Sequence, residues 1–331
     1  MRGVDRRHHS GGAPMAAMSD EGRPERECRS AEYDSGAAMP FVERPLLFDC
    51  EGERLVGILA VPERAARVAV VVIVGGPQYR AGSHRQFVKL ARHLAAGGFP
   101  TMRFDYRGMG DSTGAPRTFE ERSPDIAAAI DAVRANCSGV ASVVLWGLCD
   151  AASAALDYWH SAPDPRVVAM TLLNPWVRSE TTLAKAHLKH YYAQRLVSKE
   201  FWAKLFSGGL APAEALAAFA RNLARTFSHP QRDSSRAKEA FQERMAAALR
   251  AFPGPVLLIL SGDDLTAQEF LEYADQDPRW GGLLERPALE RHDLPAADHT
   301  FSNEEAAGEV EACTLSWLCA SVLNESRSRP R

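Results

Sequence analysis

A cysteine stands at a point of the sequence where its thiol could act as a nucleophile. The stretch "VVLWGLCDAASAAL", residues 143–156, predicts a strand that runs directly into a helix, with Cys149 on the turn. Gly147 and Ala151 lie two residues to either side, and a sharp turn of this kind needs small neighbours because its flanks crowd together. The thiol would lie at a helix N-terminus, where the dipole favours a thiolate. The alternative is a buried cysteine that only packs.

Candidates for a base and an acid follow this cysteine in the chain. A thiol nucleophile needs a base to take its proton and a carboxylate to orient that base. His299 stands in "AADHTF" before the last predicted helix, and "LLILSGDD" places Asp263 and Asp264 at the end of a predicted strand. We prefer Asp264 because it starts the "DLTA" turn that leaves the strand. Asp263 stays open as an alternative, as does Asp298, whose place beside the histidine favours a role in the loop.

Two backbone amides are candidates for holding an oxyanion. The Asp150 amide follows the nucleophile in the first turn of the helix, and a second donor should come from the loop after "VVIVGG". Pro77 in that loop has no N–H, which leaves Gln78. The Asp150 carboxylate would oppose a negative charge on the thiolate, so we expect it to cap the helix or to pair with an arginine such as Arg80 or Arg85.

Five further residues are candidates for contacts with a substrate. Arg80 and His84, near the predicted oxyanion loop, could meet an anionic group, although a surface role is the alternative. Trp176, Tyr191 and Tyr192 could line a pocket, because pockets favour aromatic side chains that carry a polar tip. Packing inside a helical lid is the alternative for these three aromatic residues.

The elements that must position these residues alternate between strands and helices. Strands are predicted at "RVAVVVIVGGP", "PTMRFDYRGMGDS", "VASVVLWG", "RVVAMTLLNPW" and "GPVLLILSGDD", with amphipathic helices after most of them and a hairpin before them. This order predicts an α/β fold with a mostly parallel sheet covered by helices on both faces. The candidate residues follow strands, and the carboxyl ends of strands are where such sheets carry their sites.

The chain divides into four predicted segments. Residues 1–39 have no hydrophobic period, so we expect a disordered extension, and whether it is authentic stays open. Residues 40–176 and 253–325 are the two parts of the α/β core. Between them, residues 177–252 have helical periodicity and far exceed the dozen or so residues that a crossover needs, so they predict a helical cap or lid insertion.

Composition narrows the class of protein. The net charge is −3 and Lys and Arg form no stripe, which argues against a nucleic-acid partner. No apolar run reaches the roughly 18 residues that a membrane span needs, and the N-terminus lacks the apolar core of a signal peptide. Six scattered cysteines without a CxxC pair argue against a metal site and fit a cytoplasmic location. No cofactor is implied, and the oligomeric state stays open.

Several motifs carry a resemblance to known families. "FDYRGMGDSTG" is similar to a strand-and-turn signature of the α/β-hydrolase superfamily. From about residue 40 to 320, "GGPQYRAGSHRQF", "GLCDAASAAL", "LNPWVRSE", "LKHYYAQRL" and "LSGDDLTAQEF" resemble the exosortase A system-associated hydrolase 1 family. The resemblance implies an α/β-hydrolase fold in bacteria that encode exosortase sorting and exopolysaccharide synthesis. Cys149, Asp264 and His299 match that family's nucleophile, acid and base, while cysteine and Ala151 depart from the wider G-x-S-x-G pattern.

These observations together predict a cytoplasmic hydrolase that forms a covalent acyl-enzyme. Cys149 would attack an ester, a thioester or a related acyl substrate, with His299 as base and Asp264 as its orienting acid. Acyl transfer to an acceptor other than water, with the same three residues, is the first alternative. The second is a fold without catalysis that serves as a binding or scaffold protein, because a fold alone never establishes an activity.

Overall fold

The computed structural model describes residues 40–76, 78–178 and 240–323. The predictions for residues 1–39, and for 179–239 of the predicted insertion, lie outside these residues. No helix in the described ranges is long and apolar enough to cross a membrane.

An eight-stranded sheet forms the centre of the protein, with the strand order β1-β2-β4-β3-β5-β6-β7-β8. The pairs β1–β2 and β2–β4 are antiparallel, and every other neighbouring pair is parallel. The sequence prediction of a mostly parallel sheet preceded by a hairpin is thus confirmed. The strands are β1 (Phe41–Cys50), β2 (Glu53–Pro62), β3 (Val68–Ile73), β4 (Thr101–Phe104), β5 (Ser142–Leu148), β6 (Val167–Leu173), β7 (Val256–Asp263) and β8 (Leu289–Asp298).

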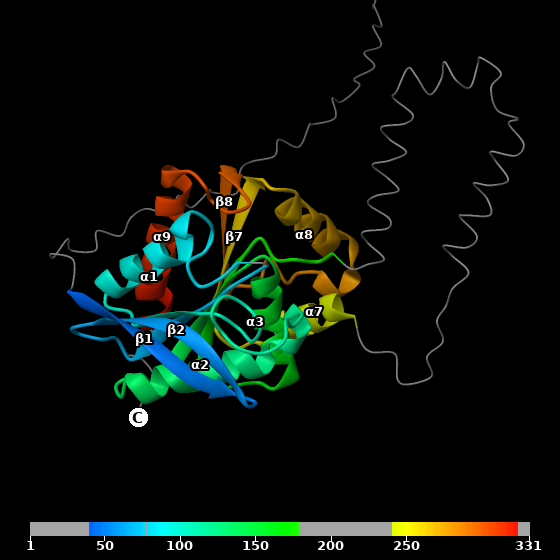
Figure 1. Cartoon of the computed structure of the whole chain (residues 1–331). Helices are drawn as coiled ribbons and strands as arrows, with labels where there is room; N and C mark the ends of the chain where they lie inside the picture. The colour runs from blue at the N-terminus through cyan, green and yellow to red at the C-terminus, as the bar shows by residue number, and fades with distance from the viewer. Residues whose placement is uncertain (1–39, 77, 179–239, 324–331) are drawn as a thin grey trace, which may run out of the picture.

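Helices cover both faces of the sheet. Right-handed crossovers place α1 on one face and α2, α3 and α7 on the other, because the chain reverses its direction across the sheet after β4. In Figure 1, α1 and α9 lie together, and α3 lies between α2 and α7. The helices are α1 (Gln86–Ala96), α2 (Ser123–Asn136), α3 (Asp150–Ser161), α7 (Phe241–Ala251), α8 (Leu265–Gln276) and α9 (Glu304–Trp317), which continues as a π-helix at Leu318–Leu323. Short 3-10 turns occur at Ser83–Arg85, Phe119–Glu121 and Pro278–Trp280.

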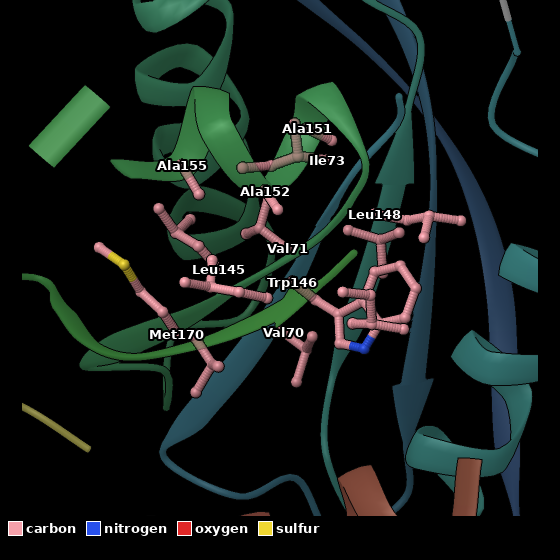
Figure 2. Packing of buried hydrophobic residues seen from close by; sticks show 14 of the residues in the cluster. Val70, Val71, Ile73, Leu145, Trp146, Leu148, Ala151, Ala152, Ala155 and Met170 are labelled. Atoms are coloured by element: carbon pink, nitrogen blue, oxygen red, sulfur yellow. The ribbon is translucent and has the colours of Figure 1, made fainter. Parts of the chain in front are cut away.

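The core lies between the central strands and the helices that pack on them. Every residue of β3 is buried, as its run of β-branched residues predicts for a central strand with both faces covered. Figure 2 shows Ala151, Ala152 and Ala155 of α3 packed against the side chains of β3 and β5. These small residues allow α3 to lie close to the sheet, so the turn between β5 and α3 rests on a rigid base.

Two elements differ from the sequence-based expectation. The sequence analysis named neither a helix after "SGDD" nor a strand at "LPAAD", whereas α8 begins at Leu265 and the edge strand β8 extends to Asp298. Five of the ten residues of β8, Pro295 among them, are exposed, so the strand lacks a continuous apolar run. The result is that β3, β5, β6, β7 and β8 all end at one edge of the sheet, where the candidate residues follow them.

Candidate active site

Cys149 occupies a strained turn between β5 and α3. Its backbone angles are φ 63° and ψ −126°, a conformation that costs free energy for any residue other than glycine. The turn is held from both sides, since Cys149 N donates to the Leu173 carbonyl at 2.9 Å and the Cys149 carbonyl accepts from Ala152 N at 3.1 Å. The thiol is only half-buried. The surrounding structure thus fixes this side chain at the helix N-terminus, where the sequence predicts it.

Glycines next to this turn allow the chain to pack closely. A Cβ on Gly147 would come within 2.6 Å of the Ala151 carbonyl carbon, so no side chain fits there. A Cβ on Gly75, at the end of the β3 strand region, would lie 2.7 Å from Asp150 Oδ1. Of the two small residues that the sequence analysis noted, Gly147 is therefore required by backbone contacts on the strand-to-helix turn.

His299 and Asp264 meet at the ends of β8 and β7. His299 Nδ1 donates to Asp264 Oδ2 over 2.8 Å, which leaves Nε2 for other partners. Asp264 is buried and caps α8, where it also accepts from Thr266 N at 3.0 Å and from Ala267 N at 3.2 Å. Asp263 is exposed. Of the carboxylates that the sequence left open, Asp264 is thus the one bonded to the histidine.

Asp298, the third of those carboxylates, holds its own loop. It accepts from Thr300 N at 3.1 Å and from Ser302 N at 2.9 Å, and it also bonds the Ser302 hydroxyl. These bonds fix the loop that carries His299, which agrees with the role that its sequence position favours.

The electrostatics of the site favour a protonated histidine. The hydrogen bond to Asp264, and next the hydrogen bond to the Cys149 side chain, raise the pKa of His299 to about 10, although burial acts in the opposite direction. Burial alone would raise the pKa of Asp264, but the bonds from His299 and from the α8 amides outweigh it and lower that pKa. The arrangement therefore stabilises an imidazolium between a thiol and a carboxylate.

Asn174 is a residue of the site that sequence reasoning did not single out. It is fully buried at the end of β6, with φ 42°, and its side-chain oxygen accepts from Ser261 N at 2.8 Å. Its side-chain nitrogen donates to Ser261 Oγ at 2.9 Å and to the His299 carbonyl at 3.4 Å. Nearby, Trp176 N donates to the Cys149 carbonyl at 3.3 Å. The segment after β6 thus joins the cysteine turn to the loop that carries His299. The sequence feature that could have revealed Asn174 is a polar residue at the end of a buried strand.

Gln78 and Asp150, the predicted oxyanion donors, both line the same cavity as Cys149. Asp150 begins α3, so its N–H has no carbonyl partner within the helix. Gln78 is held by its side chain, whose Oε1 accepts from Ser83 N and Gln86 Nε2, each at 3.2 Å. Asp150 follows β5 and Gln78 follows β3, so the two residues reach the cavity from the ends of two different strands.

The Asp150 carboxylate has partners other than those that the sequence suggested. Its Oδ1 accepts from Gly76 N at 2.6 Å, and its Oδ2 pairs with Arg122 Nη1 at 3.1 Å. The expected partners were Arg80 or Arg85, which are close to the oxyanion loop in sequence. Arg80 is instead committed to Asp105 and Asp111, so it is not available to Asp150.

A cavity of about 450 Å³ opens over Cys149. Apolar side chains make up much of its wall, and Trp176 contributes to it as the sequence suggested. Phe87 and Phe119 also line it, although sequence reasoning did not single them out. The lining residues are Gly75, Gly76, Gln78, Phe87, Phe119, Leu148, Cys149, Asp150, Trp176 and His299.

The remaining candidate substrate contacts lie elsewhere. Arg80 is absent from the described cavity wall because Asp105 and Asp111 hold its guanidinium, and His84 is exposed on the 3-10 turn before α1. Tyr191 and Tyr192 lie outside the described residues. Within the described ranges, no cluster of three His, Cys, Asp or Glu residues could hold a metal ion.

Comparison with known proteins identifies the family. The model of the alpha/beta hydrolase family matches residues 70–312, which is most of the chain and includes Cys149, Asp264 and His299. The chain belongs to this α/β hydrolase family. Among curated proteins, this α/β hydrolase is 35% identical to Protein ABHD12B of Homo sapiens over 116 residues. That match covers 33% of this chain and 31% of the human protein, so the two share about a third of their lengths.

Solved structures share the fold of this α/β hydrolase. The esterase Pf2001 of Pyrococcus furiosus superimposes with a TM-score of 0.56 at 16% identity, covering 85% of this chain and 93% of that one. Est1E of Butyrivibrio proteoclasticus, with ferulic acid bound, gives 0.53 at 14% identity over 84% and 99% of the two chains. An alpha-beta serine hydrolase homologue from Coxiella burnetii gives 0.52 at 14% identity over 84% and 97%. At these identities the likeness shows the fold alone.

Proposed function

We propose that this α/β hydrolase is an esterase or thioesterase whose nucleophile is Cys149. The observation that carries the proposal is that the side chains of Cys149 and His299 line the same cavity and interact, and that His299 Nδ1 in turn donates to the buried Asp264 at 2.8 Å. A cysteine that only packs needs neither a strained turn at a helix N-terminus nor a histidine oriented by a buried carboxylate. The esterases among the structural neighbours favour the same class of reaction.

The first half of the reaction forms an acyl-enzyme. The proton of the Cys149 thiol lies on His299 Nε2 as the thiolate–imidazolium pair that the raised pKa of His299 favours, and the sulfur attacks the acyl carbonyl carbon to form a C–S bond. Asp264 holds the imidazolium and fixes its orientation. The backbone amides of Gln78 and Asp150 receive the oxyanion. When the tetrahedral intermediate collapses, the bond to the leaving alcohol or thiol breaks, and His299 returns the proton to that group.

The second half releases the acyl group. Water gives a proton to His299 and attacks the thioester carbonyl, and the C–S bond then breaks. The sulfur leaves as the thiolate and the proton stays on His299, so the product is a carboxylic acid and the free enzyme. Phe87, Phe119 and Trp176 in the cavity wall favour an acyl group that is largely apolar. The proposed setting, a cytoplasmic enzyme of exopolysaccharide and exosortase systems, rests on the motif resemblance.

The deciding experiment is the intact mass of the protein after exposure to a panel of activated esters and thioesters. The parent should gain the mass of one acyl group, and Cys149→Ala should gain none. Cys319→Ala is a matched control because Cys319 is also a free, partly buried cysteine but lies on the C-terminal helix. It should behave as the parent does.

Two results would decide between the remaining possibilities. An adduct that persists in Cys149→Ala would overturn the assignment of the nucleophile. For a substrate that is turned over, adding amine or alcohol acceptors separates hydrolysis from acyl transfer: a new ester or amide product would favour the transferase.

A further inference from the structure

The Asp150 carboxylate joins two strand ends that carry the predicted oxyanion donors. Its own backbone amide is one donor, on the turn after β5. Its Oδ1 accepts from Gly76 N at 2.6 Å, and Gly76 belongs to the loop after β3 that also carries Gln78, the second donor. Gly75 lies so close that a Cβ there would be 2.7 Å from Asp150 Oδ1. One side chain therefore sets the spacing between the two halves of the oxyanion site.

The Asp150 carboxylate also places a negative charge next to Cys149, whose sulfur must become a thiolate to attack a substrate. Asp150 follows Cys149 directly, and a like charge at that distance opposes a thiolate. The structure supplies a compensating cation, because Arg122 Nη1 lies 3.1 Å from Asp150 Oδ2. Arg122 is 5% exposed and immediately precedes α2. The fold therefore brings it to the site from a distant part of the chain.

The guanidinium of Arg122 is itself held in place. It stacks over the Tyr106 ring, with its central carbon 4.1 Å from the ring centroid, and its Nη1 also donates to the Tyr106 hydroxyl at 3.1 Å. Burial raises the pKa of Tyr106, so the phenol stays neutral and adds no charge of its own. Arg122 therefore faces Asp150 in a fixed position rather than as a mobile surface cation.

We propose that Asp150 is a positioning residue: its carboxylate ties the loop after β3 to the cysteine turn, and Arg122 neutralises it so that it does not oppose charge on Cys149. The role assigned to the pair rests on the proposed cysteine chemistry. The contacts themselves do not, so they can be tested without a substrate.

The charge half of the proposal is tested by the rate at which iodoacetamide alkylates Cys149 as a function of pH, followed by peptide mass spectrometry. Other charges that act on the sulfur must be considered in the design. Three titratable residues of the described ranges line the cavity, Cys149, Asp150 and His299. Arg122 and Asp264 bond to these, Tyr106 bonds to Arg122, and the charge of Asp125 acts on Tyr106.

Removing Arg122 and removing Asp150 should shift the pH midpoint of Cys149 alkylation in opposite directions. Arg122→Met leaves the carboxylate unpaired, so the pH of half-maximal alkylation should rise by about one unit. Asp150→Asn leaves the guanidinium unpaired, so the same midpoint should fall. The double variant should return to the parent midpoint because both charges are gone. Arg166→Met is the matched control, since Arg166 pairs with Asp164 just before β6, at the opposite end of the strands.

The loop half is tested by amide hydrogen exchange of the peptide that spans the loop after β3. Asp150→Ala removes the acceptor of the Gly76 N–H and should speed exchange there. Asp150→Asn keeps an oxygen acceptor and should stay near the parent rate. With any ester that the parent turns over, Asp150→Ala should lower kcat/KM about tenfold to a hundredfold, because a displaced donor no longer meets the oxyanion.

The outcomes separate this proposal from the proposed function. Midpoints that do not move, or that move in the same direction in both single variants, would overturn the role of Arg122, provided that each variant unfolds cooperatively. Unchanged exchange in Asp150→Ala would overturn the loop tether. If no ester or thioester acylates the parent, the proposed function fails, while the alkylation and exchange results still decide the roles of Asp150 and Arg122.

Discussion

Asn174 and His299 are joined by a hydrogen bond from the Asn174 side chain to the His299 carbonyl at 3.4 Å, although β6 and β8 are separated by β7. The same amide bonds Ser261 twice, at the end of β7, through its backbone N and its hydroxyl. Ser261 Oγ in turn donates to the Asp298 carbonyl at 2.9 Å. The buried Asn174 side chain thus fixes the position of the loop that carries His299 relative to β6 and β7.

Asn174→Ala should therefore harm stability and activity together. The substitution leaves Ser261 N buried without its acceptor, a loss of about 1–3 kcal/mol in the free energy of unfolding. It also frees the histidine loop, so kcat should fall more than KM changes. Urea unfolding and steady-state kinetics measure the two effects. The control is Asn136→Ala, an exposed asparagine at the end of α2 that bonds only the Ala132 carbonyl; an equal loss there would contradict the argument.

Asp264→Asn should remove most of the activity while Asp263→Asn leaves it near that of the parent. The buried Asp264 accepts from His299 Nδ1, and an amide there no longer holds the imidazole in the required orientation or stabilises its charge. A fall in kcat of up to about 10⁴-fold is expected by analogy with other histidine–aspartate pairs. Asp263 is an exposed neighbour of the same type. Activity that depends on Asp263 instead would overturn the assignment.

The central strands and the order of the candidate residues could be predicted from the sequence because both are local signals. A continuous β-branched run such as β3 is expected only where both faces are covered, and the turn at Cys149 combines a strand, small residues and a helix within a dozen positions. The edge strand β8 could not be predicted in this way. Only a few of its side chains are buried, and Pro295 interrupts it.

Contacts across the sheet could not be predicted because they depend on strand order and on where each helix begins. Arg122 reaches Asp150 because the chain enters α2 beside the cysteine turn, whereas Arg80, the sequence-based choice, is closer to Asp105 at the end of β4. The link from Asn174 to His299 likewise requires β6, β7 and β8 to be neighbours. Hydrophobic periodicity predicts elements, not which strand lies next to which.

The free energy of unfolding should depend on pH through His299. Its hydrogen bonds to Asp264 and to the Cys149 side chain raise its folded pKa to about 10, against about 6.5 in an unfolded chain. A raised pKa means that the folded state binds the proton more tightly. The stabilisation is therefore fully present below about pH 6.5 and is lost as the pH rises toward about 10.

His299→Gln should remove this part of the pH dependence. Urea unfolding of the parent and the variant, from about pH 6 to about pH 10, should show a stability difference that shrinks as the pH rises. Asp264→Asn should flatten the parent profile in the same way, because it removes the first cause of the raised pKa. A difference that stays constant across this range would contradict the assignment of the proton to the histidine.

Gly147→Ala should disrupt the cysteine turn although it adds a single methyl group. The new Cβ would lie 2.6 Å from the Ala151 carbonyl carbon, so the start of α3 must move away from β5. We expect a loss of about 1–3 kcal/mol in the free energy of unfolding, as for other overpacked sites, and a large fall in kcat. Gly139→Ala is the control because a Cβ added at that position would have nothing within 4 Å of it. Equal effects of the two substitutions would refute the steric explanation.

The strain at Cys149 predicts that the two simplest inactive variants differ in stability. Cys149→Gly and Cys149→Ala both remove the thiol, but only glycine adopts φ 63° and ψ −126° without strain. The glycine variant should therefore be more stable than the alanine variant by about 1 kcal/mol, measured by urea unfolding. At Cys319, inside the C-terminal π-helix, the order should reverse because glycine costs more backbone entropy there. An alanine variant that is the more stable one at both positions would mean that the turn carries no strain, and that the cysteine conformation is held without cost to the fold.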